Sequence, residues 1–90
     1  MDKVTYTLQT PVQFTPTRRV EELAFKTDLT VRDMRRLDGQ QGAIASGATL
    51  LSLLSGEPIE LIDALSAADF LKAQEMLAPF LKDTLGTGGN

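Results

Sequence analysis

Two helix-start signals of the same kind do most to constrain the fold of this 90-residue chain. Thr30 is followed three residues later by Asp33, and Ser66 is followed three residues later by Asp69. In this pattern, a capping box, a hydroxyl and a carboxylate accept hydrogen bonds from the free amide groups of the first helical turn. The signals predict two helices, over residues 31–37 and 67–85.

Glycine and proline mark where these helices end or bend. Asp38-Gly39 ends the first helix, because glycine adopts the left-handed end conformation at low cost. Pro79 falls inside the last helix, where its missing N–H removes a backbone hydrogen bond, so we expect a kink or a break. Residues 86–90, which hold three of the seven glycines, are predicted to form a flexible tail after a single small domain over residues 1–85.

Two further helical segments are predicted between these helices. Apolar residues recur at three- and four-residue spacing over 40–54, which predicts a helix with one broad apolar face. Gly47 weakens that helix by up to about 1 kcal/mol relative to alanine, and we expect it to permit close approach of another backbone. Pro58 ends the segment Ser55-Gly-Glu-Pro58 and suits the first turn of a short helix over 59–65. The apolar face comprises Ile44, Ala48, Leu51 and Leu54.

A strand pattern precedes the helices. Val4, Tyr6 and Leu8 alternate with polar residues, which predicts a half-buried strand, and a second extended segment is predicted over 20–26. Because prolines lie between the two, we expect a β-hairpin with a long, loose connection. A hairpin alone is marginally stable in water, so it must pack on helices. The predicted fold class is α+β, mainly α, with an N-terminal β-hairpin packed on three to four short helices.

Composition argues against several classes of function. The chain has no His, Cys or Trp, so it lacks histidine-assisted nucleophiles, disulfides and thiolate metal sites. We expect Asp33 and Asp69 to stabilise helix starts rather than to catalyse. The net charge is -3, and residues 46–90 hold six acidic but only two basic residues, which suits a phosphate backbone poorly. We therefore predict no enzyme activity, no catalytic residues, no cofactor, no metal and no nucleic-acid partner.

The chain also lacks signals for membranes or export. No apolar run approaches the roughly 18–20 residues that span a bilayer. Met1-Asp2-Lys3 leads into polar residues without the apolar core of a leader sequence. We expect a soluble intracellular protein with no membrane partner.

Apolar residues in excess of one narrow stripe indicate a surface that contacts another protein. The leucine-rich segment 50–54 and the stripe on the last helix are the candidates. Core packing explains most of these residues, and an exposed remainder would form an interaction patch. The predicted partner-binding residues are Leu50, Leu53, Leu54, Phe70, Leu77 and Leu81.

A second candidate surface is the basic cluster of Arg32, Arg35 and Arg36. It either contacts an acidic partner or nucleic acid, or forms a solvated face that pairs with Asp33, Glu21 or Glu22. We favour the solvated, paired face. The helix that follows the cluster lacks the side chains that read base edges, which argues against a helix-turn-helix regulator.

The order of these elements resembles the small tail assembly chaperones of long-tailed bacteriophages, particularly the Mu-like and contractile-tailed group. The resemblance covers residues 4–81, whereas Arg35-Arg36 and the following Gly39-Gln-Gln-Gly42 have no counterpart in the family pattern. The similar segments are Val4, Leu8 and Pro11; Val20-Glu-Glu-Leu-Ala-Phe25; Leu29-Thr-Val-Arg-Asp-Met34; Leu53-Leu54-Ser-Gly-Glu-Pro58; and Ile62-Asp-x-Leu65 followed by Ser66-Ala-Ala-Asp69-Phe70.

The resemblance implies a non-enzymatic role in the host cell cytoplasm. Such chaperones bind the long, apolar tape-measure protein, keep it soluble and help recruit tail-tube subunits, and they are usually absent from the finished virion. Many are also made in a longer, frameshifted form. The alternative is a self-associating structural component of the tail or baseplate, in which the chain forms a homo-oligomer. A small DNA-binding regulator is a third, weaker alternative.

Overall fold

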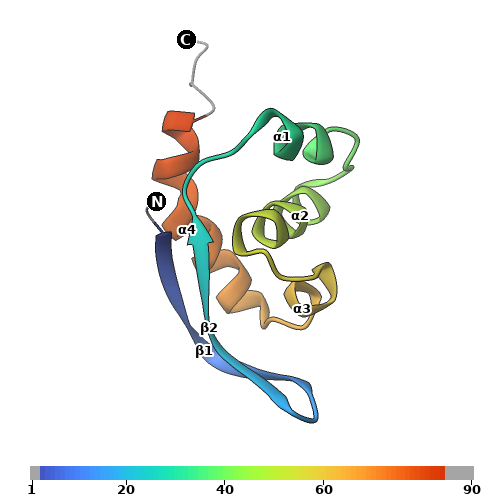
Figure 1. Ribbon diagram of the computed structural model, residues 1–90, viewed down its shortest axis with the longest axis vertical. Coiled ribbons are helices and arrows are strands. Elements are labelled where there is room, and N and C mark those ends of the chain that lie inside the picture. Colours follow the sequence, from blue (N-terminus) through green and yellow to red (C-terminus); the bar gives the residue numbers. More distant parts are fainter. Residues whose placement is uncertain (1–2, 85–90) are drawn as a thin grey trace.

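The computed structural model describes the backbone of residues 3–84, and side chains through Phe80, as a β-hairpin followed by helices (Figure 1). This architecture confirms the predicted α+β fold class. The predicted tail over 86–90 and the predicted helix end at Leu85 lie outside the described residues. The elements are β1 Lys3–Thr15, β2 Arg18–Lys26, α1 Val31–Leu37, α2 Ala43–Ser55, α3 Ile59–Asp63 and α4 Ala67–Thr84.

The two strands pair antiparallel and are joined directly through Pro16 and Thr17, so the prediction of a long, loose connection was wrong. The regular pairing is interrupted between Thr7 and Val12, where Pro11 has no N–H to donate to the neighbouring strand. The sequence placed this proline in the connection between the strands and left open whether Val12 and Phe14 extend the first strand. In the structure, β1 continues through an irregularity, because the backbone amides there have a different partner, described below.

One face of the hairpin forms the core together with the helices. Alternation along the strands buries one set of side chains, and α2, α3 and α4 supply the rest. Each such aliphatic or aromatic side chain stabilises the fold by about 1.5–3 kcal/mol when fully buried. The core residues are Leu8, Val12, Val20, Leu23, Phe25, Leu51, Leu54, Leu61, Ile62, Ala73 and Leu77.

The helix boundaries confirm the capping signals and correct one start. α1 begins at the Thr30–Asp33 capping box, in which the Thr30 Oγ1 accepts from the Asp33 N–H at 3.2 Å. α2 begins at Ala43 rather than at residue 40, because Gly42 has a φ of 93°, outside the helical region. α4 continues through Pro79 to Thr84, so the alternative of a helix break at this proline was wrong.

Gly47 lets α2 and α4 pack closely. This glycine is buried, and a Cβ atom built on it would lie 3.1 Å from the Phe70 Cζ and would overlap the Gln74 side chain. The expected close approach therefore occurs, although the neighbours are side chains of α4 rather than a second backbone.

Candidate partner-binding site

An apolar groove of about 290 Å³ lies between α2, the end of α3 and the start of α4. It lies at the small end of the range for binding sites, large enough for a few apolar side chains. Two of its large apolar residues are strongly exposed: Ile44 by 68% and Leu71 by 54%. Asp63 is the one charged residue in its lining, which comprises Ile44, Ala48, Ile62, Asp63, Leu65, Ala67, Phe70 and Leu71.

The groove is open because the first turn of α2 extends past the hydrophobic core. Leu51 and Leu54 pack in the core, but Ile44, on the same face of the helix, has no hydrophobic cover. The sequence placed Ile44 on the same apolar face as Leu51 and Leu54, and Leu71 was not among the predicted partner-binding residues. Spacing of three and four residues shows which residues share a helix face but not how far along the helix the covering layer extends.

The six partner-binding residues predicted from sequence fall into different environments. Phe70 lines the groove. Leu50 and Leu53 are half-buried on α2. Leu54 and Leu77 are buried in the core, and the side chain of Leu81 lies outside the described residues. Phe70 therefore belongs to the groove, whereas Leu54 and Leu77 are covered by the chain itself.

A buried carboxylate, Asp69, holds the start of α4 against the irregular part of β1. Its Oδ1 accepts from the Tyr6 hydroxyl at 2.7 Å and from the Gln9 N–H at 2.9 Å. Its Oδ2 accepts from the Thr10 N–H at 3.0 Å and from the Ser66 hydroxyl at 3.1 Å. These bonds explain the strand irregularity, because the amides of Gln9 and Thr10 point to α4. Asp69 thereby fixes the helix that carries Phe70 and Leu71.

Both ionisable members of this cluster have shifted pKa values. Burial by itself would raise the pKa of Asp69, but the hydrogen bonds from Gln9, Tyr6, Thr10 and Ser66 outweigh it and lower the pKa overall. Burial, and then the hydrogen bond to the negative Asp69, raise the pKa of Tyr6 from 10.0 to about 12. At neutral pH the carboxylate is ionised and the phenol is neutral, which is the pairing that the bond requires.

Asp33 plays a similar part for α1. Its Oδ2 lies 2.9 Å from the Lys26 Nζ and accepts from the Thr30 N–H at 3.1 Å. The Lys26 ammonium, followed by the Thr30 amide, holds the pKa of Asp33 below its usual value. Asp33 therefore connects α1 to the end of β2. Asp33 and Asp69 both keep their predicted roles at helix starts, and the long-range contacts add a tertiary role.

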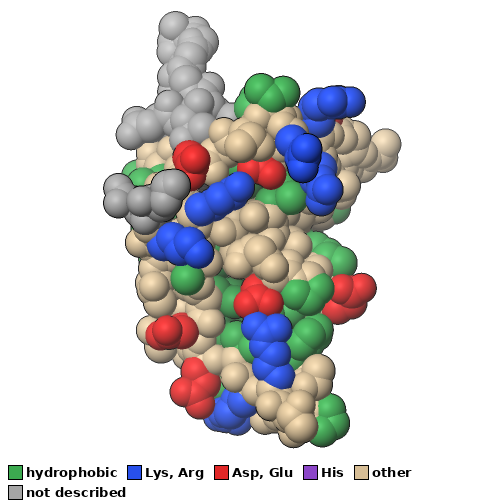
Figure 2. Space-filling view, viewed as in Figure 1, with side chains coloured by type: hydrophobic (Ala, Val, Ile, Leu, Met, Phe, Trp, Pro, Cys, Tyr) green, Lys and Arg blue, Asp and Glu red, His purple; other side chains and the backbone are tan. Residues whose placement is uncertain are grey.

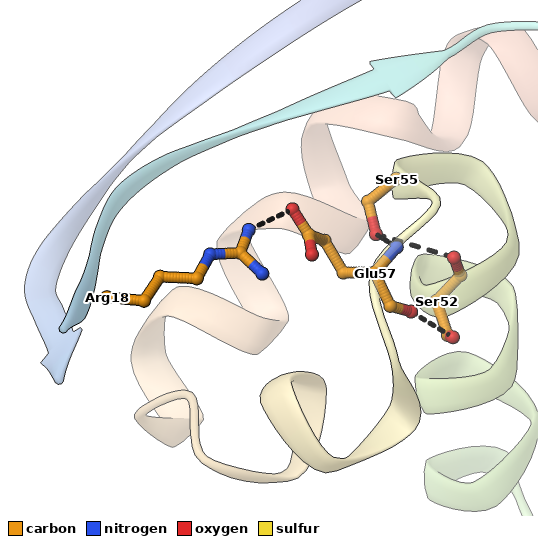
Figure 3. A network of polar contacts seen from close by, with 4 residues as sticks. All are labelled: Arg18, Ser52, Ser55 and Glu57. Carbon is orange, nitrogen blue, oxygen red and sulfur yellow. Dashed lines mark hydrogen bonds and ion pairs between the residues drawn. The ribbon is translucent and has the colours of Figure 1, made fainter. Parts of the chain in front are cut away.

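A polar network connects the hairpin tip to the loop between α2 and α3 (Figure 3). Arg18 Nη2 lies 2.7 Å from Glu57 Oε2, and the Arg18 guanidinium also lies 6.0 Å from the centre of the Phe14 ring. Ser52 Oγ donates to the Glu57 carbonyl at 2.5 Å, and the Glu57 N–H donates to Ser55 Oγ at 3.2 Å. The loop that precedes α3 is thus bonded to both α2 and the hairpin.

The arginine cluster of α1 is exposed and unpaired. Figure 2 shows basic side chains gathered over the region that α1 occupies in Figure 1. Among the residues that the structure describes, Arg32, Arg35 and Arg36 form no ion pair, whereas Asp33 pairs with Lys26 and Glu21 with Arg19. The arginines are solvated, as the favoured prediction has it, but the predicted pairing with Asp33, Glu21 or Glu22 was wrong. Lys26 pairs with Asp33 and Arg19 with Glu21, and no ion pair of Glu22 occurs in the described part of the chain.

Among the side chains that the structure describes, those of residues 3–80, no three or more acidic groups gather closely enough to hold a metal ion. No helix within residues 3–84 is both long and apolar enough to cross a bilayer.

Comparison with protein-family models gives a match over residues 5–82, to the family described as "Phage tail assembly chaperone proteins, E, or 41 or 14". Neither the curated proteins nor the solved structures gave a match to the chain.

Proposed function

Because the chain belongs to the family of phage tail assembly chaperone proteins, we propose that it binds the tape-measure protein through the groove between α2, α3 and α4. Family membership supports a role in tail assembly. The groove is the observation that carries the more specific proposal. An amphipathic helix of the partner inserts a few apolar side chains between Ile44 and Leu71 and removes both from water.

The charge around the groove suits a chaperone for an apolar partner. Asp63 lines the groove, and Glu60 lies one helical turn before it on α3. Both side chains are exposed, so they stay hydrated while the apolar surfaces meet. Hydrated carboxylates beside the groove increase the solubility of the complex, which keeps the tape-measure protein soluble until tail-tube subunits are recruited.

Such a role also determines where and when the protein acts. The chaperone acts without catalysis, in the host cell cytoplasm, and leaves before the virion is complete. Its binding energy comes from burial of apolar surface, at about 25 cal/mol per Å². A small groove therefore gives modest affinity for each site, which suits a partner that must later be released to the tail tube.

Co-expression with a tape-measure protein, the long helical partner of the proposal, tests it. Size-exclusion chromatography with light scattering should show co-elution, and the partner should remain soluble only when the chain is present. The Ile44→Asp and Leu71→Asp variants should each weaken co-elution, because they place a charge in the apolar groove. Half-buried Leu50 and Leu53 remain predicted contacts, and charge substitution at both tests them separately.

Val31→Asp is a matched control for Ile44→Asp. Both residues are β-branched, both lie in the first turn of a helix, and they are exposed by 71% and 68%. A new carboxylate near a helix N-terminus is tolerated at both positions. Equal co-elution of all three variants with wild type would refute groove binding. A homo-oligomer that ignores the partner would favour the structural tail component instead.

A further inference from the structure

α1 presents a surface that the proposed groove does not use. Arg32, Arg35 and Arg36 are exposed on it, together with two apolar side chains, Val31 at 71% and Met34 at 44% exposed. We call these five residues the α1 surface. Exposed apolar side chains ringed by one sign of charge are typical of a contact site rather than of a solvated helix.

The same chain carries a surface of opposite character. The groove exposes Ile44 and Leu71, Asp63 lines it, and Glu60 is exposed one helical turn before Asp63 on α3. Glu75 is exposed one turn after Leu71 on α4. In the described part of the chain, Glu60, Asp63 and Glu75 form no ion pair. They equal the unpaired guanidinium groups of the α1 surface in number and are opposite in charge.

We propose that the α1 surface of one copy binds the acidic, apolar groove of a second copy. The contact joins two unlike surfaces, as in heterologous assembly, so each copy offers one donor surface and one acceptor surface. Val31 and Met34 enter the groove while the arginines meet its carboxylates. The proposal goes beyond the proposed function, although both assign the groove to an apolar ligand, and a tape-measure helix therefore competes with self-association.

The small contact area predicts weak, salt-dependent association. Exposed ion pairs contribute little individually, and three together account for roughly tenfold in affinity. By sedimentation equilibrium, the average mass of the wild-type chain should rise above that of a monomer as concentration increases, at about 0.05 M NaCl. The rise should diminish at about 0.5 M NaCl, where charges are screened over a few ångströms.

Two charge-reversal variants identify the surfaces. One carries Arg32→Glu, Arg35→Glu and Arg36→Glu. The other carries Glu60→Lys, Asp63→Lys and Glu75→Lys. All six side chains are exposed, and circular dichroism with thermal unfolding checks that each variant folds.

Each variant alone should be monomeric, because one member of every pair now repels the other. An equal mixture should associate, because both possible contacts between unlike variants are again complementary. If the groove variant alone associates as wild type does, the groove carboxylates do not form the contact and the proposal is wrong. A wild-type chain that stays monomeric up to about 1 mM at low salt also overturns the proposal.

The same variants separate this proposal from the proposed function. The α1 variant has lost the donor surface but keeps an unchanged groove, so it should still keep the long helical partner soluble. Loss of self-association with retained partner binding supports both proposals. Retained self-association in the α1 variant contradicts only the self-association contact, and lost partner binding in a folded α1 variant contradicts groove-only binding of the partner.

Discussion

Replacing Asp69 with asparagine should destabilise the fold strongly although the change is nearly isosteric. The carboxylate accepts two hydrogen bonds on each oxygen, including one backbone N–H on each, from Gln9 and Thr10. Asparagine offers one acceptor oxygen and one NH₂ donor. Whichever way the amide is oriented, one of the two backbone N–H groups faces another donor.

The magnitude follows from those bonds. A polar group left without a partner costs about 1–3 kcal/mol, and the bonds that remain lose their charge-assisted component, roughly 0.5 kcal/mol each. Gln9 and Thr10 are themselves exposed, so water can reach the backbone N–H group that loses its partner. We therefore take the lower part of the summed cost, a loss of about 2–3 kcal/mol in the free energy of unfolding. A domain of this size has a total stability of about 5–15 kcal/mol, so the loss is a substantial fraction.

Urea unfolding followed by circular dichroism measures this loss. With an m value of about 1–1.5 kcal/mol/M, the midpoint should fall by about 2 M. Asp63→Asn is the matched control, because that aspartate is exposed and has no hydrogen bond in the described structure, and it should change stability by less than about 0.5 kcal/mol. If Asp69→Asn unfolds at the same urea concentration as Asp63→Asn, the four-bond cluster does not stabilise the fold.

Acid should destabilise the protein through Asp33 and Asp69. Folding lowers the pKa values of both carboxyl groups, so their contribution to stability is complete above the unfolded-state pKa of about 3.9 and is lost as pH falls below it. The fall in the urea midpoint at low pH should therefore be smaller in Asp33→Asn than in wild type. Alkali should act through Tyr6. Its pKa is raised from 10.0 to about 12, so its contribution is complete below pH 10 and is lost toward pH 12, and Tyr6→Phe should lack this alkaline step in a pH titration of stability. Gly47→Leu should lower stability by about 1–3 kcal/mol through overpacking against α4, measured by urea unfolding, and an unchanged midpoint would show that Gln74 moves aside without cost.

Local signals predicted most of the secondary structure. The bounds of α1 follow from Thr30, Asp33 and the glycine after Asp38, all within one or two helical turns. The end of α2 follows in the same way from Gly56, which adopts a φ of 74°. Such signals involve atoms a few residues apart, so the sequence states them completely.

The errors arose where a distant residue changes a local rule. Pro11 normally ends a strand, but β1 continues because Asp69 binds the two amides that β2 leaves free. The arginines of α1 have acidic neighbours in sequence, yet Lys26 pairs with Asp33 and Arg19 with Glu21. Arg19 and Glu21 are two residues apart and share one face of β2. The Lys26–Asp33 pair depends instead on the positions of β2 and α1 in space, which no spacing rule gives.

The candidate site shows the same division. The sequence by itself determined an α+β chain with two capped helices, a hairpin that needs a helical cover, and more apolar residues than a narrow stripe requires. Only the tertiary structure decided that Leu54 and Leu77 are core, whereas Ile44 and Leu71 line an open groove. The physical reason is that hydrophobic burial depends on which surfaces meet, and side chains with the same helical spacing differ in exposure according to where the covering layer ends.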